Sequence, residues 1–147
     1  YALLRNPREL ERRRDQPELL DGAVEEALRY DSPVQATSRH PLEDVEIAGT
    51  PVPKGVEVLA MLAAANRDPN RYPDPDRFDI ERSGEPHLSF STGVHFCLGA
   101  NLARAEAVAA VRAVVERLPE FEGISAESKW KPNPLLRGLE RLELSWS

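Results

Sequence analysis

The pattern of apolar and polar positions predicts helices toward both ends of the chain and an irregular centre. Asn6 followed by Pro7 is typical of a helix start, because an Asn side chain can cap the first turn and a proline ring already has a helical φ. We therefore expect a short helix over residues 7–14, with the arginines at 12–14 on a solvated face. Pro17 opens a second predicted helix, whose apolar residues recur every three or four positions until Ser32 and Pro33 stop it.

The period changes after residue 33. Val45, Ile47 and Val52 lie in a run interrupted by Pro and Gly, which predicts short strands and a hairpin turning near Gly49, and residues 56–61 predict another strand. Residues 66–89 contain several prolines and no sustained periodicity, so we expect a long packed coil. The clearest helix covers residues 100–118, with one apolar stripe. The tail predicts strands, with a turn at Asn133 and alternating apolar residues at 142, 144 and 146. The expected fold class is mainly α with small β-sheets.

Composition narrows the possible functions. The chain has 147 residues, and 19 Lys and Arg against 25 Asp and Glu give a formal net charge of −6. A chain with this balance cannot neutralise many phosphates at once, so we expect no nucleic-acid partner. No apolar run approaches the roughly 20 residues of a membrane span, so we expect no membrane partner. The single Cys excludes an internal disulfide and fits a reducing, cytoplasmic compartment. The abrupt start at Tyr1, without Met or a signal pattern, is interpreted as that of a fragment.

The lone Cys97 lies directly before the Ala-rich helix, in a turn bounded by Gly93 and Gly99. Backbone N–H groups at a helix start can donate to a thiolate, and the helix dipole favours its negative charge, so this sulfur could bind a metal. The glycines would allow a flat ligand to approach closely. Other interpretations are a small buried apolar residue, a Cys–His nucleophile with His95, and a zinc ligand together with the histidines His40, His87 and His95.

The segment Phe90-Ser-Thr-Gly-Val-His-Phe-Cys97-Leu-Gly99, followed by Leu-Ala-Arg at 102–104, resembles the heme-binding loop of cytochrome P-450 monooxygenases. The resemblance extends over essentially the whole chain. Glu26-Ala-Leu-Arg29 is similar to the Glu-x-x-Arg helix of that family, and Phe78-Asp-Ile-Glu-Arg82 is similar to the segment that supplies a second Arg. The last strands resemble those of bacterial, soluble members. The implied fold is the carboxy-terminal portion of the P-450 fold, and residues 1–147 would form no complete independent domain.

The resemblance implies a role for each matching residue. Cys97 is expected to be the axial thiolate ligand of heme b, with Glu26, Arg29 and Arg82 as a buried structural network. The expected heme contacts are Arg39, Phe90, His95, Gly99 and Ala103, with Arg39 and His95 on the propionates. Positions that face a substrate in the family match Val34, Gln35, Ala36, Leu135 and Leu136.

The implied activity is monooxygenation: one oxygen atom of O2 enters a small organic substrate, with electrons from a ferredoxin-type donor. The donor's docking face could include Arg104 and Arg112, although arginines on a helix are usually only solvated. The oxygen-activating residues are expected upstream of Tyr1, so no catalytic residue is expected in this chain, and the fragment alone is expected to be inactive. The alternative is a P-450-like scaffold or activator without functional heme, against which the complete Cys97 motif argues.

Overall fold

The computed structural model describes residues 1–117, 121–124 and 128–146. Its helical elements are α1 (Ala2–Arg5), α2 (Pro7–Asp15), the 3-10 turn η1 (Pro17–Leu19), α3 (Leu20–Tyr30), α4 (Leu62–Ala65), the 3-10 turn η2 (Gly93–His95) and α5 (Ala100–Arg117). Its strands are β1 (Thr37–Arg39), β2 (Val45–Ile47), β3 (Thr50–Val52), β4 (Val58–Ala60), β5 (Phe121–Ile124), β6 (Lys129–Trp130), β7 (Leu139–Arg141) and β8 (Leu144–Trp146). The predicted class, helices with small β-sheets, is confirmed.

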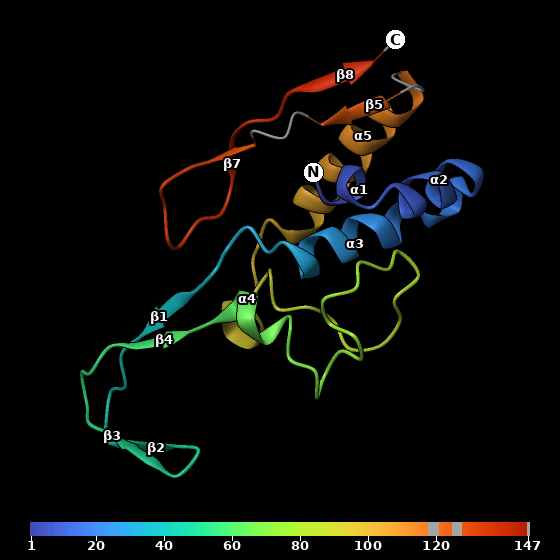
Figure 1. Cartoon of the computed structure of the whole chain (residues 1–147). Helices are drawn as coiled ribbons and strands as arrows, with labels where there is room; N and C mark the ends of the chain where they lie inside the picture. Colours follow the sequence, from blue (N-terminus) through green and yellow to red (C-terminus); the bar gives the residue numbers. More distant parts are fainter. Residues whose placement is uncertain (118–120, 125–127, 147) are drawn as a thin grey trace.

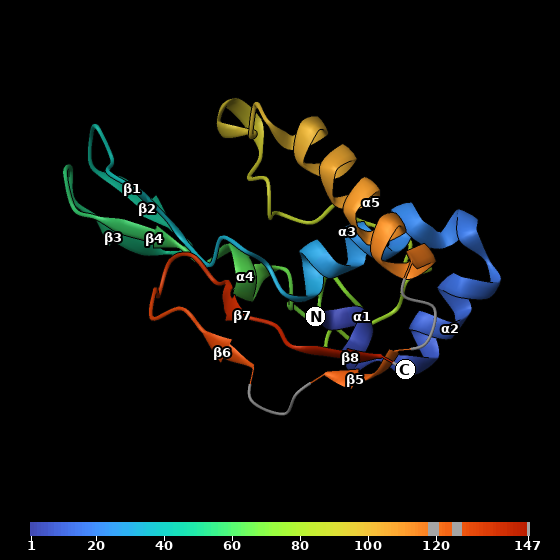
Figure 2. The same ribbon diagram turned by 90° about the horizontal axis from the view of Figure 1, so that it is seen from above.

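The strands described here pair only two by two and antiparallel: β1 with β4, β2 with β3, β5 with β8, and β6 with β7. The predicted hairpin turn is at Ala48 and Gly49, whose φ values of 48° and 78° are both positive. Two positive φ values in a two-residue turn match the twist of the flanking strands, and Gly adopts them without steric cost. The β2–β3 hairpin and the β1–β4 pair that precedes and follows it form a hairpin arm that extends away from the helices (Figures 1 and 2).

The core lies where α1, α3, α5 and the long coil meet (Figure 1). Its buried residues, from α1, α3 and the coil, are Ala2, Leu3, Ala23, Phe78 and Ile80, and Val111 of α5 packs against them. The coil approaches α3 so closely at Gly22 that a Cβ there would lie 2.3 Å from the carbonyl oxygen of Ile80. The coil is therefore packed against the helices, as the sequence predicts for a structured loop.

The amino-terminal helices differ from the prediction in three ways. A short helix, α1, precedes the predicted one. Asn6 does not cap α2 with its side chain, which instead donates a hydrogen bond to the carbonyl of Ala2 at 2.8 Å. Two of the arginines predicted to be solvated are not: Arg13 is only 4% exposed, and Arg12 pairs with Glu9 and Glu81. The chain folds back over α2 here, so neighbours distant in sequence decide which face of that helix meets water.

Other boundaries differ by a few residues. The second helix begins as η1 at Pro17 and becomes α-helical at Leu20, and the strand predicted over 56–61 is limited to β4. The long helix is described up to Arg117, and Leu118 lies outside the described residues. Its apolar stripe is not packed along its whole length, because Val115 is buried while Leu102 is 64% exposed. Leu142 falls between β7 and β8.

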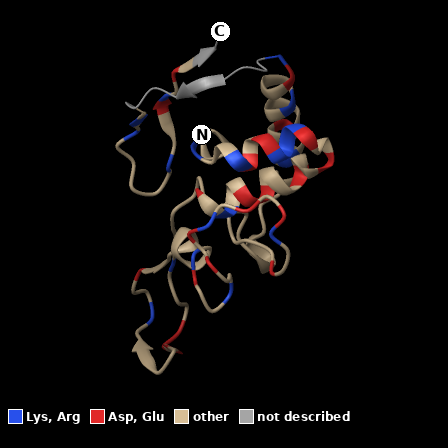
Figure 3. Ribbon diagram, turned by 45° about the vertical axis from the view of Figure 1, so that its right-hand side comes forward, with Lys and Arg blue, Asp and Glu red and all other residues tan. Residues whose placement is uncertain are grey.

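Charges of both signs are interspersed over the helices, and charged residues also occur along the hairpin arm (Figure 3). Among the residues that the structure describes, no helix has both the length and the apolar character needed to cross a bilayer.

Candidate functional site

Cys97 lies in the tight loop that leads into α5. The N–H of Cys97 donates to the carbonyl of Phe90 at 2.9 Å, and the N–H of Ala100 donates to the carbonyl of Cys97 at 3.2 Å. Gly93, at a φ of +60°, lets the chain turn back within η2. The thiol is exposed, so the alternative of a buried apolar cysteine is wrong for this structure.

The thiol borders a cavity of about 420 Å³ between the loop, the end of α3 and the start of the hairpin arm. Its mainly apolar lining includes Leu28, Val34 and Leu62, and four of the six residues predicted to contact heme also line it: Arg39, Phe90, His95 and Cys97. An apolar cavity with one thiol and two basic side chains is chemically suited to a flat, apolar cofactor that carries a metal and acidic groups.

Gly99 and Ala103, the other two predicted contacts, do not line this cavity. Gly99 lies directly against the thiol, because a Cβ at that position would be 3.9 Å from Sγ of Cys97. The N–H of Ala103 donates to the carbonyl of Gly99 at 2.9 Å in the first turn of α5. These two small residues therefore shape the helix start beside the thiol.

The two predicted propionate partners come from different elements that border the cavity. Arg39 ends β1, and its Nη1 donates to the hydroxyl of Thr37 at 2.9 Å and to the carbonyl of Ser38 at 2.7 Å. His95 ends η2 and is exposed. The β1–β4 pairing and the Cys97 loop bring these residues, 56 positions apart in the numbering, to one cavity.

A buried polar cluster anchors the segment before the loop. Asn66, fully buried after α4, donates to the hydroxyls of Ser32 and Ser89 at 2.8 and 2.9 Å and accepts the N–H of Leu88 at 2.7 Å. The hydroxyl of Ser89 donates to the carbonyl of Leu28 in α3 at 2.6 Å. Buried polar groups are costly unless they are hydrogen-bonded, so this satisfied cluster holds residue 89 in place. No sequence signal singled out Asn66.

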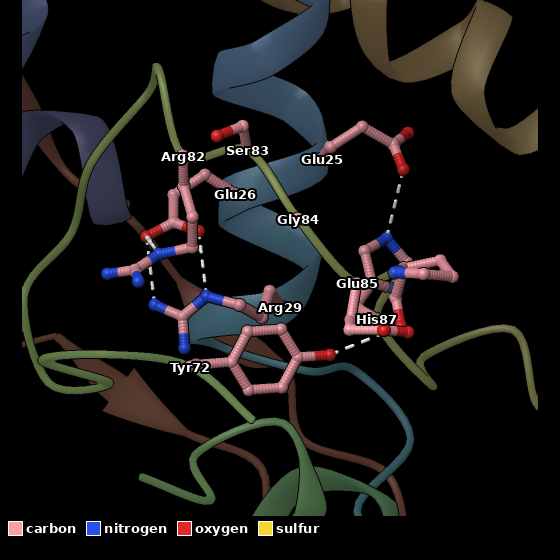
Figure 4. Close-up of a pocket in the computed structure, with 10 residues that line it drawn as sticks. Glu25, Glu26, Arg29, Tyr72, Arg82, Ser83, Gly84, Glu85 and His87 are labelled. Carbon is pink, nitrogen blue, oxygen red and sulfur yellow. Dashed lines mark hydrogen bonds and ion pairs between the residues drawn. The ribbon is translucent and has the colours of Figure 1, made fainter. Parts of the chain in front are cut away.

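The structure brings Glu26, Arg29 and Arg82 together, as Figure 4 shows. Arg29 forms a two-point contact with Glu26, from Nε at 2.7 Å and Nη2 at 2.8 Å, and both side chains are buried. Arg82 donates from Nε to the same carboxylate at 3.2 Å. Three carbonyls of the coil also accept hydrogen bonds from Arg29, those of Asn66, Pro75 and Arg77. The network joins α3 to the coil.

A second ionic cluster, which the sequence did not reveal, lies one residue earlier on α3. Glu25 accepts hydrogen bonds from Arg104 of α5 at 2.6 and 3.0 Å, and Nε2 of His87 lies 3.1 Å from the same carboxylate. Burial lowers the pKa of His87 below its ordinary value, although Glu25 opposes that shift. Partial burial would raise the pKa of Glu25, but its hydrogen bond and attraction to Arg104, together with His87, hold that pKa below the ordinary value.

Only one of the five residues predicted to face a substrate lines the cavity, namely Val34. The tail is nevertheless brought beside it, because Val34 forms an isolated β-bridge with Leu136 and the N–H of Gln35 donates to the carbonyl of Leu135 at 2.8 Å. Ala36 is buried. Within the described part of the chain, no three His, Cys, Asp or Glu side chains gather in a way that could hold a metal ion, so the zinc alternative finds no ligand set there.

The chain thus combines a thiol at a helix start, on an apolar cavity, with a separate Glu–Arg–Arg network that ties the coil to α3. Comparison with known proteins identifies the family. Residues 8–139 match the family described as Cytochrome P450, and the chain belongs to that family. It is 52% identical over 149 residues to cytochrome P450 monooxygenase PikC from Streptomyces venezuelae, and 45% identical over 144 residues to 6-deoxyerythronolide B hydroxylase from Saccharopolyspora erythraea. These alignments cover 99% and 97% of this chain. Members of the family bind heme b.

A crystal structure of P450BioI in complex with an acyl carrier protein ligated to hexadec-9Z-enoic acid superposes with a TM-score of 0.95 at 43% identity, covering 99% of this chain. The chain spans 36% of the length of the two curated relatives and 38% of the P450BioI chain. The fold described here is therefore that of part of a cytochrome P450.

Proposed function

We propose that residues 1–147 are the carboxy-terminal part of a longer bacterial heme-thiolate monooxygenase, in which Cys97 is the axial ligand of the heme iron. The supporting observation is the exposed Cys97 thiol at the cavity of about 420 Å³, held at the start of α5 in a chain that belongs to the cytochrome P450 family. The complete enzyme would act in the cytoplasm, inserting one atom of O2 into a small organic substrate with electrons from a ferredoxin-type donor.

The residues around the cavity fit a heme. Apolar side chains such as Leu28, Val34 and Phe90 can cover a porphyrin, and the thiol can bind its iron. Arg39 and His95 can donate hydrogen bonds to propionates, for which charge-assisted contacts are strong. When bound, heme with a thiolate ligand supplies the electron-rich iron that favours cleavage of the O–O bond.

The work of this chain's own residues is binding and placement. Cys97 lies directly before the start of α5, where the helix dipole stabilises negative charge on sulfur. Glu26, Arg29 and Arg82 hold the coil against α3, and Asn66 holds Ser89, so that the segment leading into the loop is fixed to the helices. The residues that activate oxygen are proposed to lie in the rest of the protein.

The test is the visible spectrum of the complete protein, reduced and bound to carbon monoxide. A thiolate ligand gives a red-shifted Soret band, and Cys97→Ala is expected to abolish it. Thr92→Ala is a matched control in the same loop, because the Thr92 side chain makes no capping hydrogen bond to η2. A band that persists in Cys97→Ala would show that another residue binds the iron, and a wild-type protein without the band would overturn the proposed function itself.

A further inference from the structure

The cluster around Glu25 contains three segments of the chain. Glu25 lies on α3, His87 and Phe90 lie on the segment before the Cys97 loop, and Arg104 lies on α5. The Arg104 guanidinium makes a two-point contact with Glu25, and its central carbon lies 4.6 Å from the centroid of the Phe90 ring. A guanidinium over an aromatic face is attractive because the ring face carries partial negative charge.

His87 also belongs to this cluster. Its side chain is only 5% exposed, and its ring centroid lies 5.8 Å from that of Phe90. The N–H of Ser89 donates to Nδ1 at 3.2 Å, so the proton of the neutral imidazole lies on Nε2, the atom 3.1 Å from Glu25. The Phe90 ring is thus close to a guanidinium and to an imidazole that share one carboxylate.

Phe90 links this cluster to the thiol through the backbone. Its carbonyl accepts the hydrogen bond from the N–H of Cys97 at 2.9 Å, so the place of Phe90 determines one of the contacts that define the loop. Glu25 contacts Arg104, and Arg104 contacts the Phe90 ring, but neither Glu25 nor Arg104 lines the cavity that Cys97 borders. Their effect on the loop therefore passes through Phe90.

We propose that Glu25 and Arg104 are a positioning pair for the Cys97 loop: the carboxylate orients the guanidinium, the guanidinium holds the Phe90 ring, and Phe90 holds the backbone at Cys97. For the heme, this inference rests on the proposed function, because the loop is then the one that carries the iron ligand. Neither residue touches the reacting atoms.

The first measurement is hydrogen–deuterium exchange of peptides covering residues 90–99 in the complete, heme-loaded protein. Glu25→Gln, Arg104→Gln and Arg104→Lys are each expected to speed exchange of this loop about two- to fivefold, the factor that corresponds to losing one partly exposed guanidinium–ring contact. Peptides from β1–β4 are expected to exchange as in wild type. Arg112→Gln is the matched control, because it removes one positive charge from an exposed position of the same helix.

The second measurement is the reduction potential of the heme. Removing a positive charge near iron lowers the potential and removing a negative charge raises it, so an effect of charge alone would give Arg104→Gln and Glu25→Gln shifts of opposite sign. If the pair acts by positioning the loop, the reduction potentials of Arg104→Gln and Glu25→Gln shift in the same direction. The potential of Arg104→Lys shifts in that direction too, because an ammonium cannot make the two-point contact with Glu25. Shifts of opposite sign, or loop exchange no faster than in Arg112→Gln, would overturn the positioning pair.

These outcomes are separate from those of the proposed function. If the wild-type protein shows the thiolate Soret band but the four variants exchange alike, the positioning pair is wrong and the heme-thiolate assignment stands. If wild type lacks the band, the link of the pair to a heme ligand falls together with the proposed function.

Discussion

Replacing Glu26 with alanine would leave two guanidinium groups, those of Arg29 and Arg82, without their shared carboxylate inside the protein. Glu26 and Arg29 are each 3% exposed, and Oε1 of Glu26 also accepts the N–H of Asp79 at 2.9 Å. The substitution therefore removes the counter-charge of a buried arginine and an acceptor of a backbone amide at once. Breaking a buried ion pair from one side costs about 3–5 kcal/mol, because the remaining charge stays desolvated.

Urea unfolding of the complete protein, followed by far-UV circular dichroism, measures this loss. At a slope of about 3 kcal/mol per M, a loss of about 3–5 kcal/mol moves the midpoint down by about 1 to 1.7 M. Glu81→Gln is the matched control. Its carboxylate belongs to the same coil but is 53% exposed and pairs with Arg12 at the surface, so about 1 kcal/mol or less is expected.

A double-mutant cycle then tests whether the residues act as one unit. Glu26→Ala and Arg82→Ala share one contact, so their effects should fail to add by about 0.5–3 kcal/mol. Small losses that simply add, close to that of Glu81→Gln, would refute the reasoning that this network is buried and shared.

Three further outcomes follow from the structure. Burial lowers the pKa of His87 below its ordinary 6.5, so as the pH falls the unfolded chain takes up the proton before the folded protein does. The contribution of neutral His87 to stability is therefore complete above pH 6.5 and declines as the pH falls below 6.5. His87→Gln should flatten the dependence of Tm on pH below 6.5. Gly22→Ala should cost about 1–3 kcal/mol by the same urea assay, because its Cβ would collide with the Ile80 carbonyl, whereas Gly138→Ala, with open space around it, should cost far less. The isolated 147-residue chain should bind heme only weakly and show no monooxygenase turnover, because apolar surface of the Cys97 loop, such as Val94 at 98% exposure, would stay in water; tight one-to-one binding in a spectral titration would contradict this.

Much of the local structure could be predicted from spacing alone. The hairpin at Gly49 and the helix from Ala100 were predicted because the hydrogen bonds that form them join residues close in sequence, so local chemistry selects them. The Cys97 motif likewise identified the family before any contact was known, because the turn, the thiol and the helix start lie within ten residues.

The errors arose where distant residues decide the outcome. Arg13 was predicted to be solvated and is buried, and Asn6 was predicted to cap α2 but bonds back to α1. Residues that share a helix face can be read from a period of 3.6, but whether that face meets water or protein depends on what the rest of the chain lays over it.

The sequence by itself thus determined most of the longer elements, the family and the candidate ligand, because each depends on residues near one another; the short helices α1 and α4 were not predicted. Only the tertiary structure decided which side chains share an environment. Glu25 meets Arg104 across 79 positions, and Glu26 meets Arg82 across 56, although nothing in the spacing distinguishes Glu25 from an ordinary surface carboxylate. Contacts between residues so far apart in sequence form because folding buries the faces of α3, the coil and α5 against one another. A charge that is buried there is desolvated and needs a charged or hydrogen-bonding partner, and no local sequence pattern indicates which residue that partner is.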